Sequence, residues 1–292
     1  MKVGIVTRNR KYWSSLQLRK VLTRKGIPHI CFSFSQLMAR IGYTPYATQE
    51  TIGIPQELDA LLIRPIGRGS LEETVFRMNL LHRLQRLGMY ILNPPQAIEN
   101  CADKYHILSI LEEGGLPVPR TAVTEDETEA LKAFHELGQD VIVKPIFGSR
   151  GLGSTRVTDP ENAHLTFQTI RFNHGVIYLQ EFIPHHHTDL RAFVVGDRVV
   201  AAMKRVSDSW KTNYSQGGRP VSTQLDPTRK DMAIQAAHLI QCKIAGVDMV
   251  DSPTGPILIE VNSQPGWKGL QSVTNHNIAE TIIDFLLSEL KT

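Results

Sequence analysis

Residues 257–269 read ILIEVNSQPGWKG and put an acid and an amide two positions apart on an apolar strand. Successive side chains on a strand alternate between its two faces, so Glu260 and Asn262 point to the same side. This segment therefore presents two oxygen-bearing side chains next to each other on one face.

A second acid lies on the segment just before this strand. Residues 247–250 form a short apolar strand that contains Asp248, and residues 251–256 (DSPTGP) are rich in turn formers. A hairpin centred on Thr254 sets Asp248 opposite Glu260. Three oxygen ligands without Cys or His suit Mg²⁺ better than zinc. Because Mg²⁺ held by few carboxylates usually shares its coordination with phosphate, the hairpin predicts a nucleotide-phosphate enzyme.

The composition is that of an ordinary globular protein. The chain has 292 residues, 41% hydrophobic and 21% charged, enough for two or three small domains with a substantial core. Its net charge of +3 is too small to argue for nucleic acid and fits basic residues gathered around an anionic ligand. No signal sequence or membrane-spanning run is visible, which predicts a cytoplasmic protein without a membrane partner. Three widely spaced cysteines match no metal-binding pattern and favour a reducing compartment: Cys31, Cys101 and Cys242.

Strand and helix patterns predict an α/β (α+β) protein of three domains. In residues 1–97, buried-type strands alternate with amphipathic helices, which predicts a small parallel α/β domain. Residues 98–183 form a second unit around a glycine-rich loop. Residues 184–292 read as mostly antiparallel strands, with a helix over residues 230–245 and a last helix over residues 277–290.

The glycine-rich loop, residues 147–153, follows a strand over residues 141–144. Glycine lets backbone N–H groups approach a phosphate closely, although a plain hairpin loop has the same composition. The loop lacks the Gly-Lys-Ser/Thr ending of a Walker loop. Lys144 at the strand end and Lys104 farther upstream are each either a phosphate partner or an ordinary surface lysine.

Residues 180–184 (QEFIP) have the pattern of a strand at a domain boundary. Pro184 cannot donate a hydrogen bond in a ladder, so the strand edge is free there. Backbone groups beside Phe182 and Ile183 could bind a flat adenine, or the segment is an edge strand without a ligand.

Polar residues in the last third of the chain could face an anionic substrate. Asp189 and Arg191 share a strand face, either as an ion pair or as contacts to ribose and a carboxylate. Residues 207–218 (SDSWKTNYSQGG) could form a lid or a plain loop. The run of histidines at residues 185–187 is interpreted as a solvated loop rather than a metal site, because neighbours on an extended segment point in opposite directions.

In this order, the motifs resemble the ATP-grasp superfamily and, within it, the RimK-type glutamate ligases. They are a lysine at the end of the first α/β unit, Val-Lys-Pro before the glycine-rich loop, Gln-Glu-Phe-Ile, Asp-x-Arg, and Asp…Glu-x-Asn. The resemblance covers essentially the whole chain, and IEVNSQPG with Asp248 upstream is its most specific part. Residues 64–73 (RPIGRGSLEE) and residues 93–106 also resemble the tetrahydromethanopterin α-L-glutamate ligase branch.

The resemblance implies an ATP-grasp fold, in which two α+β subdomains clamp ATP beside an N-terminal parallel α/β domain. It implies two Mg²⁺ or Mn²⁺ ions, held by Asp248, Glu260 and Asn262. It implies nucleotide contacts from several motifs: Lys104, Lys144, Gly148, Ser149, Gly151, Gly153, Gln180, Glu181, Phe182, Ile183, Asp189, Lys211 and Asn213. It implies catalytic contacts to a carboxylate or acyl phosphate from Arg191, Arg205 and Lys211. The family often has Arg where this chain has Lys211, which offers a point charge instead of a two-pronged donor.

The implied reaction adds L-glutamate to a small-molecule carboxylate acceptor, tetrahydromethanopterin, through an acyl phosphate, and releases ADP and phosphate. The resemblance also implies a homo-oligomer, either a dimer or a tetramer. Two alternatives stay open. One is a RimK-type ligase for another acceptor, such as a ribosomal protein C-terminus, a deazaflavin coenzyme or an amino-group carrier protein. The other is a non-catalytic ATP-binding scaffold, against which the intact metal-ligand set argues.

Overall fold

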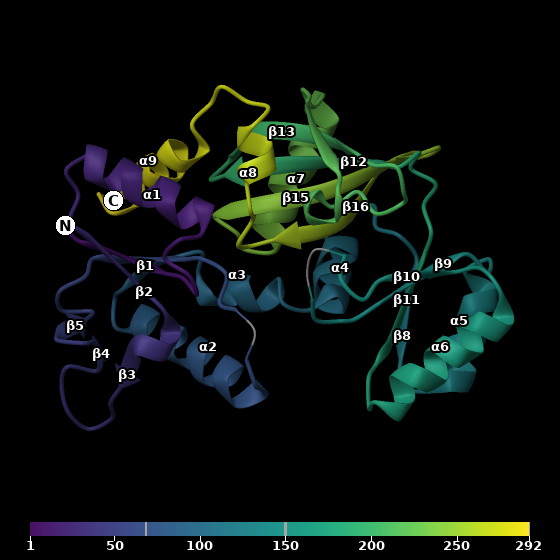
Figure 1. Cartoon of the computed structure of the whole chain (residues 1–292), viewed down its shortest axis with the longest axis horizontal. Coiled ribbons are helices and arrows are strands. Elements are labelled where there is room, and N and C mark those ends of the chain that lie inside the picture. Colours follow the sequence, from purple (N-terminus) through teal and green to yellow (C-terminus); the bar gives the residue numbers. More distant parts are fainter. Residues whose placement is uncertain (68, 149–150, 292) are drawn as a thin grey trace.

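The chain forms an elongated molecule with three main sheets (Figure 1). The computed structural model describes residues 1–67, 69–148 and 151–291. The N-terminal sheet lies at one end, the sheet of the middle residues lies at the other end, and the five-stranded C-terminal sheet lies between them (Figure 1). This arrangement confirms the predicted α/β (α+β) class. None of the helices in the described ranges is long and apolar enough to cross a membrane.

The N-terminal sheet is parallel, as predicted. Its strands have the spatial order β2-β1-β6-β7, with bounds β1 (Val3–Val6), β2 (His29–Phe32), β6 (Ala60–Ile63) and β7 (Tyr90–Leu92). Every residue of β1 and β6 is buried, because helices cover both faces. Helix α1 (Trp13–Arg24) packs on one face and α2 (Leu71–Arg86) on the other.

A small antiparallel sheet beside this unit was not predicted. It follows a 3₁₀ turn, η1 (Phe34–Gln36), and contains β3 (Leu37–Ala39), β4 (Ala47–Gln49) and β5 (Ile52–Ile54). Strands of three residues offer too few alternating positions to be recognised from their period.

The middle sheet is antiparallel and has two helices on one face. Its order is β10-β9-β11-β8, with bounds β8 (Thr121–Thr124), β9 (Val141–Lys144), β10 (Thr155–Val157) and β11 (Ile177–Glu181). Helices α5 (Glu127–Glu136) and α6 (Pro160–Phe172) cover it through the fully buried side chains of Phe134 and Phe167.

The C-terminal sheet is antiparallel with the order β14-β13-β12-β15-β16. Its strands are β12 (Thr188–Val195), β13 (Arg198–Val206), β14 (Arg219–Ser222), β15 (Ile244–Ser252) and β16 (Gly255–Asn262). A second 3₁₀ turn, η2 (Tyr214–Gln216), precedes β14. The β15–β16 hairpin has Asp248 opposite Glu260 and Gly246 opposite Asn262, which confirms the predicted register.

One helix boundary predicted from the sequence was wrong. The helix predicted over residues 230–245 is α7 (Pro227–Leu239), because residues from Ile244 onward pair with β12 instead. The segment from residue 95 to residue 113 contains two helices, α3 (Pro95–Asn100) and α4 (Lys104–Glu113). Asp103 begins α4 by accepting hydrogen bonds from the backbone N–H groups of Tyr105 and His106, and this cap puts Lys104 in the first turn.

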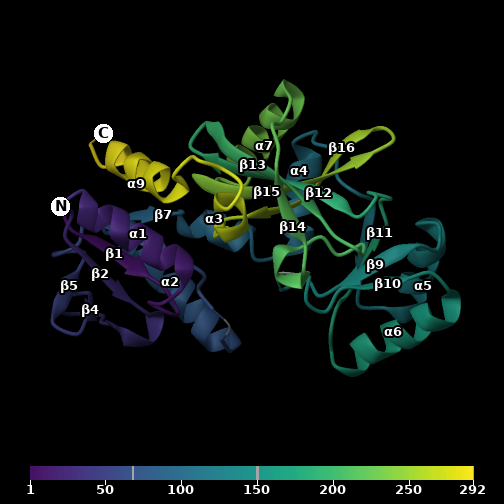
Figure 2. The same ribbon diagram turned by 45° about the horizontal axis from the view of Figure 1, so that its top comes forward.

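The C-terminal helix returns to the N-terminal sheet. After the short helix α8 (Lys268–Gln271), α9 (Ile278–Glu289) packs beside α1, and both termini lie at the same end of the molecule (Figures 1 and 2). One apolar cluster joins α1, β1, β6 and α9 to β12 and to Trp267, which is fully buried. The domain boundaries after residues 97 and 183 stay a prediction.

Asn93 connects the N-terminal unit to the C-terminal sheet through four hydrogen bonds. Its side-chain oxygen accepts from the backbone N–H groups of Lys243 and Ile244, both at 2.8 Å. Its amide nitrogen donates to the carbonyl groups of Ile244 and Ser263, at 2.7 and 2.5 Å. A buried amide with all its bonds made fixes the relative position of the segments that it joins.

Replacing this amide tests its structural role. Asn93→Leu should destabilise the protein by roughly 3 kcal/mol or more, because it leaves buried backbone donors and acceptors without partners. Thermal unfolding followed by circular dichroism should show a fall in Tm of several degrees. Asn173→Ala, which removes an exposed helix-end amide, is the matched control and should change Tm little. An unchanged Tm for Asn93→Leu would contradict the role.

Candidate active site

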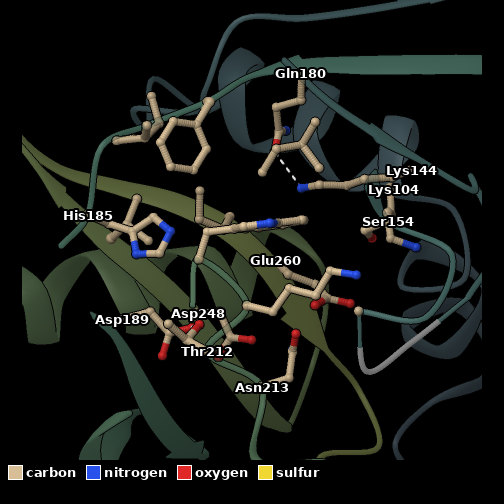
Figure 3. Close-up of a pocket in the computed structure, with 18 of the residues that line it drawn as sticks. Lys104, Lys144, Ser154, Gln180, His185, Asp189, Thr212, Asn213, Asp248 and Glu260 are labelled. Carbon is tan, nitrogen blue, oxygen red and sulfur yellow. Dashed lines mark hydrogen bonds between the residues drawn. The ribbon is translucent and has the colours of Figure 1, made fainter. Parts of the chain in front are cut away.

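A cavity lies between the middle sheet and the C-terminal sheet, at the side of α4. Figure 3 shows Lys104 and Lys144 at one side of it and Asp189, Asp248 and Glu260 at another. Besides residues discussed below, its lining includes Ile142, Pro145, Leu152, Ser154, Val250 and Ile259. Most of the residues predicted for the nucleotide therefore meet in one place, although they come from distant parts of the chain.

Three buried charged residues, Asp189, Arg205 and Asp248, form the floor of this cavity, and buried Arg191 lies behind them. The guanidinium of Arg205 donates two hydrogen bonds to Asp189, at 2.6 and 2.5 Å, and also lies 3.1 Å from an Asp248 oxygen. The guanidinium of Arg191 donates to both oxygens of Asp248. The pairs are direct cross-strand neighbours on β12, β13 and β15, since Asp189 faces Arg205 and Arg191 faces Asp248. The two acids and two arginines balance each other within the buried sheet face.

This network also sets the protonation of Asp248. Burial by itself raises the pKa of a carboxyl group, but Arg191 and Arg205 outweigh it and hold the pKa of Asp248 below its usual value. In return, the two carboxylates outweigh burial and raise the pKa of Arg205. Asp248 therefore stays ionised, with its oxygens shared between two guanidinium groups.

Glu260 differs from Asp248 because the cations near it, Lys104, Arg191 and Lys144, only partly offset the effects that raise its pKa. Its half-buried carboxylate makes no hydrogen bond or salt bridge with any described residue, and burial together with Asp248 raises its pKa. The predicted third ligand, Asn262, has a buried amide nitrogen without a partner among these residues. A divalent cation would relieve the repulsion between the two carboxylates, so the donor set of Asp248, Glu260 and Asn262 fits Mg²⁺. Elsewhere in the described ranges, no group of three or more His, Cys, Asp or Glu side chains is placed to hold a metal.

Lys144 points into the cavity and donates a hydrogen bond of 2.5 Å to the Gln180 side-chain oxygen (Figure 3). Gln180 is held in turn by Thr121 and Tyr178. Burial lowers the pKa of Lys144 to about 8, and Lys104 also lowers it while Glu260 raises it. A buried amine of this kind gains much from an anionic ligand.

The ammonium group of Lys104, unlike that of Lys144, is surrounded by backbone carbonyl groups. Its ammonium group donates to the carbonyl oxygens of Pro145, Ile146 and Gly148, at 3.1, 3.3 and 3.0 Å. These carbonyls form the start of the glycine-rich loop, so Lys104 fixes the loop as well as lining the cavity. Sequence reasoning missed this contact, because it depends on how α4 meets the loop.

The glycine-rich loop and the polar loop over residues 207–218 meet over the cavity. Gly148, Gly151 and Gly153 have φ angles of 146°, 68° and 76°, a region that favours glycine. A Cβ at Gly151 would lie 2.5 Å from the side-chain oxygen of Asn213, so glycine also permits the close approach of the two loops. Ser149 lies outside the described residues. Lys211 lines the cavity from the polar loop, as do Trp210 and Thr212, which were not predicted.

The segment predicted for adenine lies at the edge of the cavity. The N–H groups of Glu181 and Phe182 donate to the carbonyls of Arg120 and Asp140, but within the described chain the N–H of Ile183 has no backbone partner. The Glu181 side chain is turned to Arg120, which donates to it at 2.6 and 2.8 Å. The Glu181 side chain is thus engaged elsewhere, while the N–H of Ile183 is available to a planar ligand.

His185 is a cavity residue that the sequence interpretation missed. Its ring lies 5.7 Å from the Phe182 ring, and its buried Nδ1 has no hydrogen-bond partner in the described ranges. Burial lowers the pKa of this imidazole. The assumption of an extended segment was wrong, because His186 and His187 have φ angles of 48° and 57°, and these two side chains are exposed.

Of the predicted residues that the structure describes, three do not line the cavity. Arg191 lies behind Asp248, Gly153 lies between the lining residues Leu152 and Ser154, and Asn262 lies two positions beyond the lining residue Glu260 on β16. Asp189 does line it, yet both of its oxygens are engaged, by Arg205 and by the Thr212 hydroxyl at 2.6 Å. A ribose contact by Asp189 would have to share these bonds.

Comparison with known proteins gives the same family throughout. Residues 101–286 match the RimK-like ATP-grasp domain. The tetrahydromethanopterin:alpha-L-glutamate ligase of Methanococcus maripaludis is 34% identical over 100% of this chain and 99% of the relative. The enzyme of the same name from Methanosarcina acetivorans is 30% identical over 98% of each chain.

Solved structures share the fold along the whole chain. The ATP-grasp ligase PsnB complexed with a minimal precursor superposes with a TM-score of 0.79 at 20% identity, covering 98% of each chain. A RimK domain ATP-grasp protein from Sphaerobacter thermophilus gives a TM-score of 0.76 at 20% identity, covering 98% of this chain and 99% of that one. The fold is therefore shared at a level of identity where side chains differ widely.

The lowered pKa of Lys144 gives a prediction about anion affinity. Below about pH 8 the amine is protonated and attracts phosphate, whereas above it the free protein must take up a proton to bind. ADP affinity measured by calorimetry should therefore fall as the pH rises from 8 to 10, by up to about tenfold per pH unit. Lys144→Met should bind more weakly and lose most of this dependence. Equal ADP affinities at pH 7 and pH 9.5 in the unmodified protein would refute the prediction.

Proposed function

The chain belongs to the RimK-like ATP-grasp family, and on this basis we propose that it joins L-glutamate to a carboxylate of tetrahydromethanopterin, with conversion of ATP to ADP and phosphate. The observation that carries the proposal is the similarity along the full length of ligases that bear this activity in their name. Ligases of this family form a C–N bond and consume ATP.

The nucleotide would occupy the cavity between the two antiparallel sheets. The N–H of Ile183 would contact the adenine, and His185 with its unpartnered Nδ1 would face the ribose beside Asp189. Lys144 would contact the phosphates from the end of β9. The glycine-rich loop, anchored by Lys104, would cover them with its backbone N–H groups.

The metal site would lie at the hairpin. Asp248, Glu260 and Asn262 would hold two Mg²⁺ or Mn²⁺ ions, which when bound supply positive charge to the phosphate oxygens. Glu260 must be deprotonated for this role, and its raised pKa means that acid weakens metal binding at a higher pH than for an ordinary glutamate. Asp248 stays ionised to lower pH, because its pKa is lowered.

The chain's cationic groups would orient the acceptor carboxylate and stabilise charge during phosphoryl transfer. Arg205 reaches the cavity from the floor, and Lys211 reaches it from the polar loop. Arg191, which lies behind Asp248, would act by fixing that carboxylate in place. The acceptor carboxylate would attack the γ-phosphorus and displace ADP, which gives an acyl phosphate. The α-amine of glutamate would then attack the acyl carbon, lose a proton and displace phosphate, which leaves the amide.

Water must be kept from the acyl phosphate, because hydrolysis would waste ATP. The contact of Asn213 with Gly151 joins the two loops over the cavity and would provide this cover. The proposal includes a homo-oligomer and a cytoplasmic location.

ADP release should require both glutamate and reduced pterin acceptor. A coupled ADP assay with product mass should show one reaction with tetrahydromethanopterin and none when either substrate is omitted. Activity only with a deazaflavin or a peptide acceptor would move the chain to another RimK-type specificity. Nucleotide binding without turnover on any acceptor would favour the scaffold alternative.

A matched pair of hairpin variants tests the metal site. Glu260→Gln should lower kcat by about 10²–10³-fold and raise the Mg²⁺ concentration needed for half-maximal rate, because an unpaired carboxylate ligand is lost. Asp251→Asn changes an exposed acid on the other strand of the same hairpin, one that pairs with Arg229, and should leave both quantities nearly unchanged. Equal Mg²⁺ dependence in the unmodified enzyme and Glu260→Gln would exclude the assignment.

A further inference from the structure

Three buried nitrogen groups without a partner lie along the seam between the N-terminal and C-terminal sheets. In the described residues, five buried side-chain polar atoms have no hydrogen bond; one is the His185 nitrogen in the nucleotide cavity, and another is Asn262 Nδ2 at the metal hairpin. The other three are Arg64 Nε, Gln264 Nε2 and Trp267 Nε1. All three carry N–H groups, and leaving buried donors unpaired is unfavourable and rare. A ligand rich in hydrogen-bond acceptors, such as a carboxylate or phosphate, would satisfy them.

Arg64 is the charged member of this seam. It is 6% exposed, donates to the Pro265 carbonyl at 2.8 Å, and lies over the Trp267 ring at 4.7 Å from the ring centre. Within the described chain it has no carboxylate partner, in contrast to the buried Arg191 and Arg205, which each pair with an aspartate. Burial lowers its pKa to about 10, so it is still a cation at neutral pH. A buried cation without a counter-ion is a strong attractor for an anion.

The position of Arg64 in the fold is one where α/β proteins bind ligands. It follows β6 directly, and β6 lies beside β1 in the order β2-β1-β6-β7. The chain moves outward from β1 to β2 and then returns to β6 on the other side, so the topology reverses between β1 and β6. Ligands of open parallel sheets bind at the carboxyl ends of the strands at such a point. Arg8, just after β1, adds an exposed cation that lies over Gly67, since a Cβ there would be 3.0 Å from Arg8 Cδ.

The seam adjoins the active-site floor. The Gln264 side chain accepts a hydrogen bond from the N–H of Ile66 at 3.3 Å, so the turn after β16 contacts the end of β6. On its other side, this turn packs on Gly246, where a Cβ would lie 2.8 Å from Pro265 Cβ and 3.0 Å from Arg191 Nη1. A molecule bound at Arg64 would therefore lie near Arg191, which contacts Asp248.

We propose that Arg64, with Gln264 and Trp267, forms a subsite for a non-reacting carboxylate or phosphate group of the acceptor, and that this subsite orients the reacting carboxylate toward the metal hairpin. The proposal rests on the proposed function for the identity of the acceptor. It commits to the acceptor as the source of the anion, rather than to the incoming glutamate or to ATP. Arg64 is then a determinant of acceptor specificity, which selects molecules with a second anionic group.

Steady-state kinetics can separate the three substrates. Arg64→Met keeps a long apolar side chain but removes the charge, and it should raise KM for tetrahydromethanopterin about 10- to 100-fold, the effect of a lost charge-assisted hydrogen bond. KM for ATP and for glutamate should change less than about twofold. Arg64→Lys should recover part of the loss. Arg77→Met is the control, because Arg77 is also buried in the N-terminal unit but already has Glu73 as its partner. An unchanged acceptor KM in folded Arg64→Met, or a rise confined to glutamate, would overturn the proposal.

Anion binding can also be measured without turnover. In ¹⁵N NMR spectra, the Trp267 indole N–H signal, assigned with Trp267→Phe, should shift in a saturable manner when glutarate or inorganic phosphate is added. The shift should be absent in Arg64→Met and retained in Arg77→Met. No shift in the unmodified protein would overturn the subsite, whatever the catalytic result. If the shift occurs but ADP release with tetrahydromethanopterin does not, the subsite holds and the proposed acceptor is wrong.

Discussion

The two buried aspartate–arginine pairs on the C-terminal sheet are the interaction on which the rest of the site depends. Asp189 with Arg205 and Arg191 with Asp248 place four buried charges on adjacent strands. Removal of one partner would leave a buried charge uncompensated, which is far more unfavourable than loss of a surface pair. The pairs thereby keep Asp248 ionised and hold it opposite Glu260, and they leave Glu260 as the carboxylate that has no partner of its own among the described residues. This arrangement explains why the pKa of Asp248 is lowered while the pKa of Glu260 is raised.

A second constraint is that contacts between segments far apart in the sequence hold the N-terminal sheet against the C-terminal sheet. The last helix packs beside the first one, and Asn93 joins the end of the N-terminal sheet to the strand that leads into the metal hairpin. The turn after the hairpin then touches Arg64 at the end of β6. The N-terminal sheet is consequently positioned relative to the hairpin by side-chain bonds. An acceptor that contacts this sheet can therefore be presented to the nucleotide cavity in one orientation.

Local sequence patterns predicted the fold well where the spacing of apolar and polar residues fixes which face of a strand or helix each side chain occupies. The register of Asp248 and Glu260 was predictable, because alternation on a hairpin leaves few choices once the turn is located. The contact of Lys104 with the glycine-rich loop and the pairing of Arg191 with Asp248 were not, since they join segments 44 and 57 residues apart. His185 was missed for another reason, because left-handed residues after it break the alternation that the interpretation assumed. The family resemblance was sufficient to name most of the cavity residues, but it could not show which of them already bond to each other.

The central claim is that the acceptor carboxylate is phosphorylated before glutamate attacks. The most direct measurement uses an acceptor labelled with ¹⁸O in that carboxylate, followed by ³¹P NMR of the phosphate released during ligation. An acyl phosphate requires that one labelled oxygen passes from the carboxylate to the phosphate in each turnover, together with formation of ADP. Phosphate without the label, or AMP and pyrophosphate as the products, would contradict the mechanism.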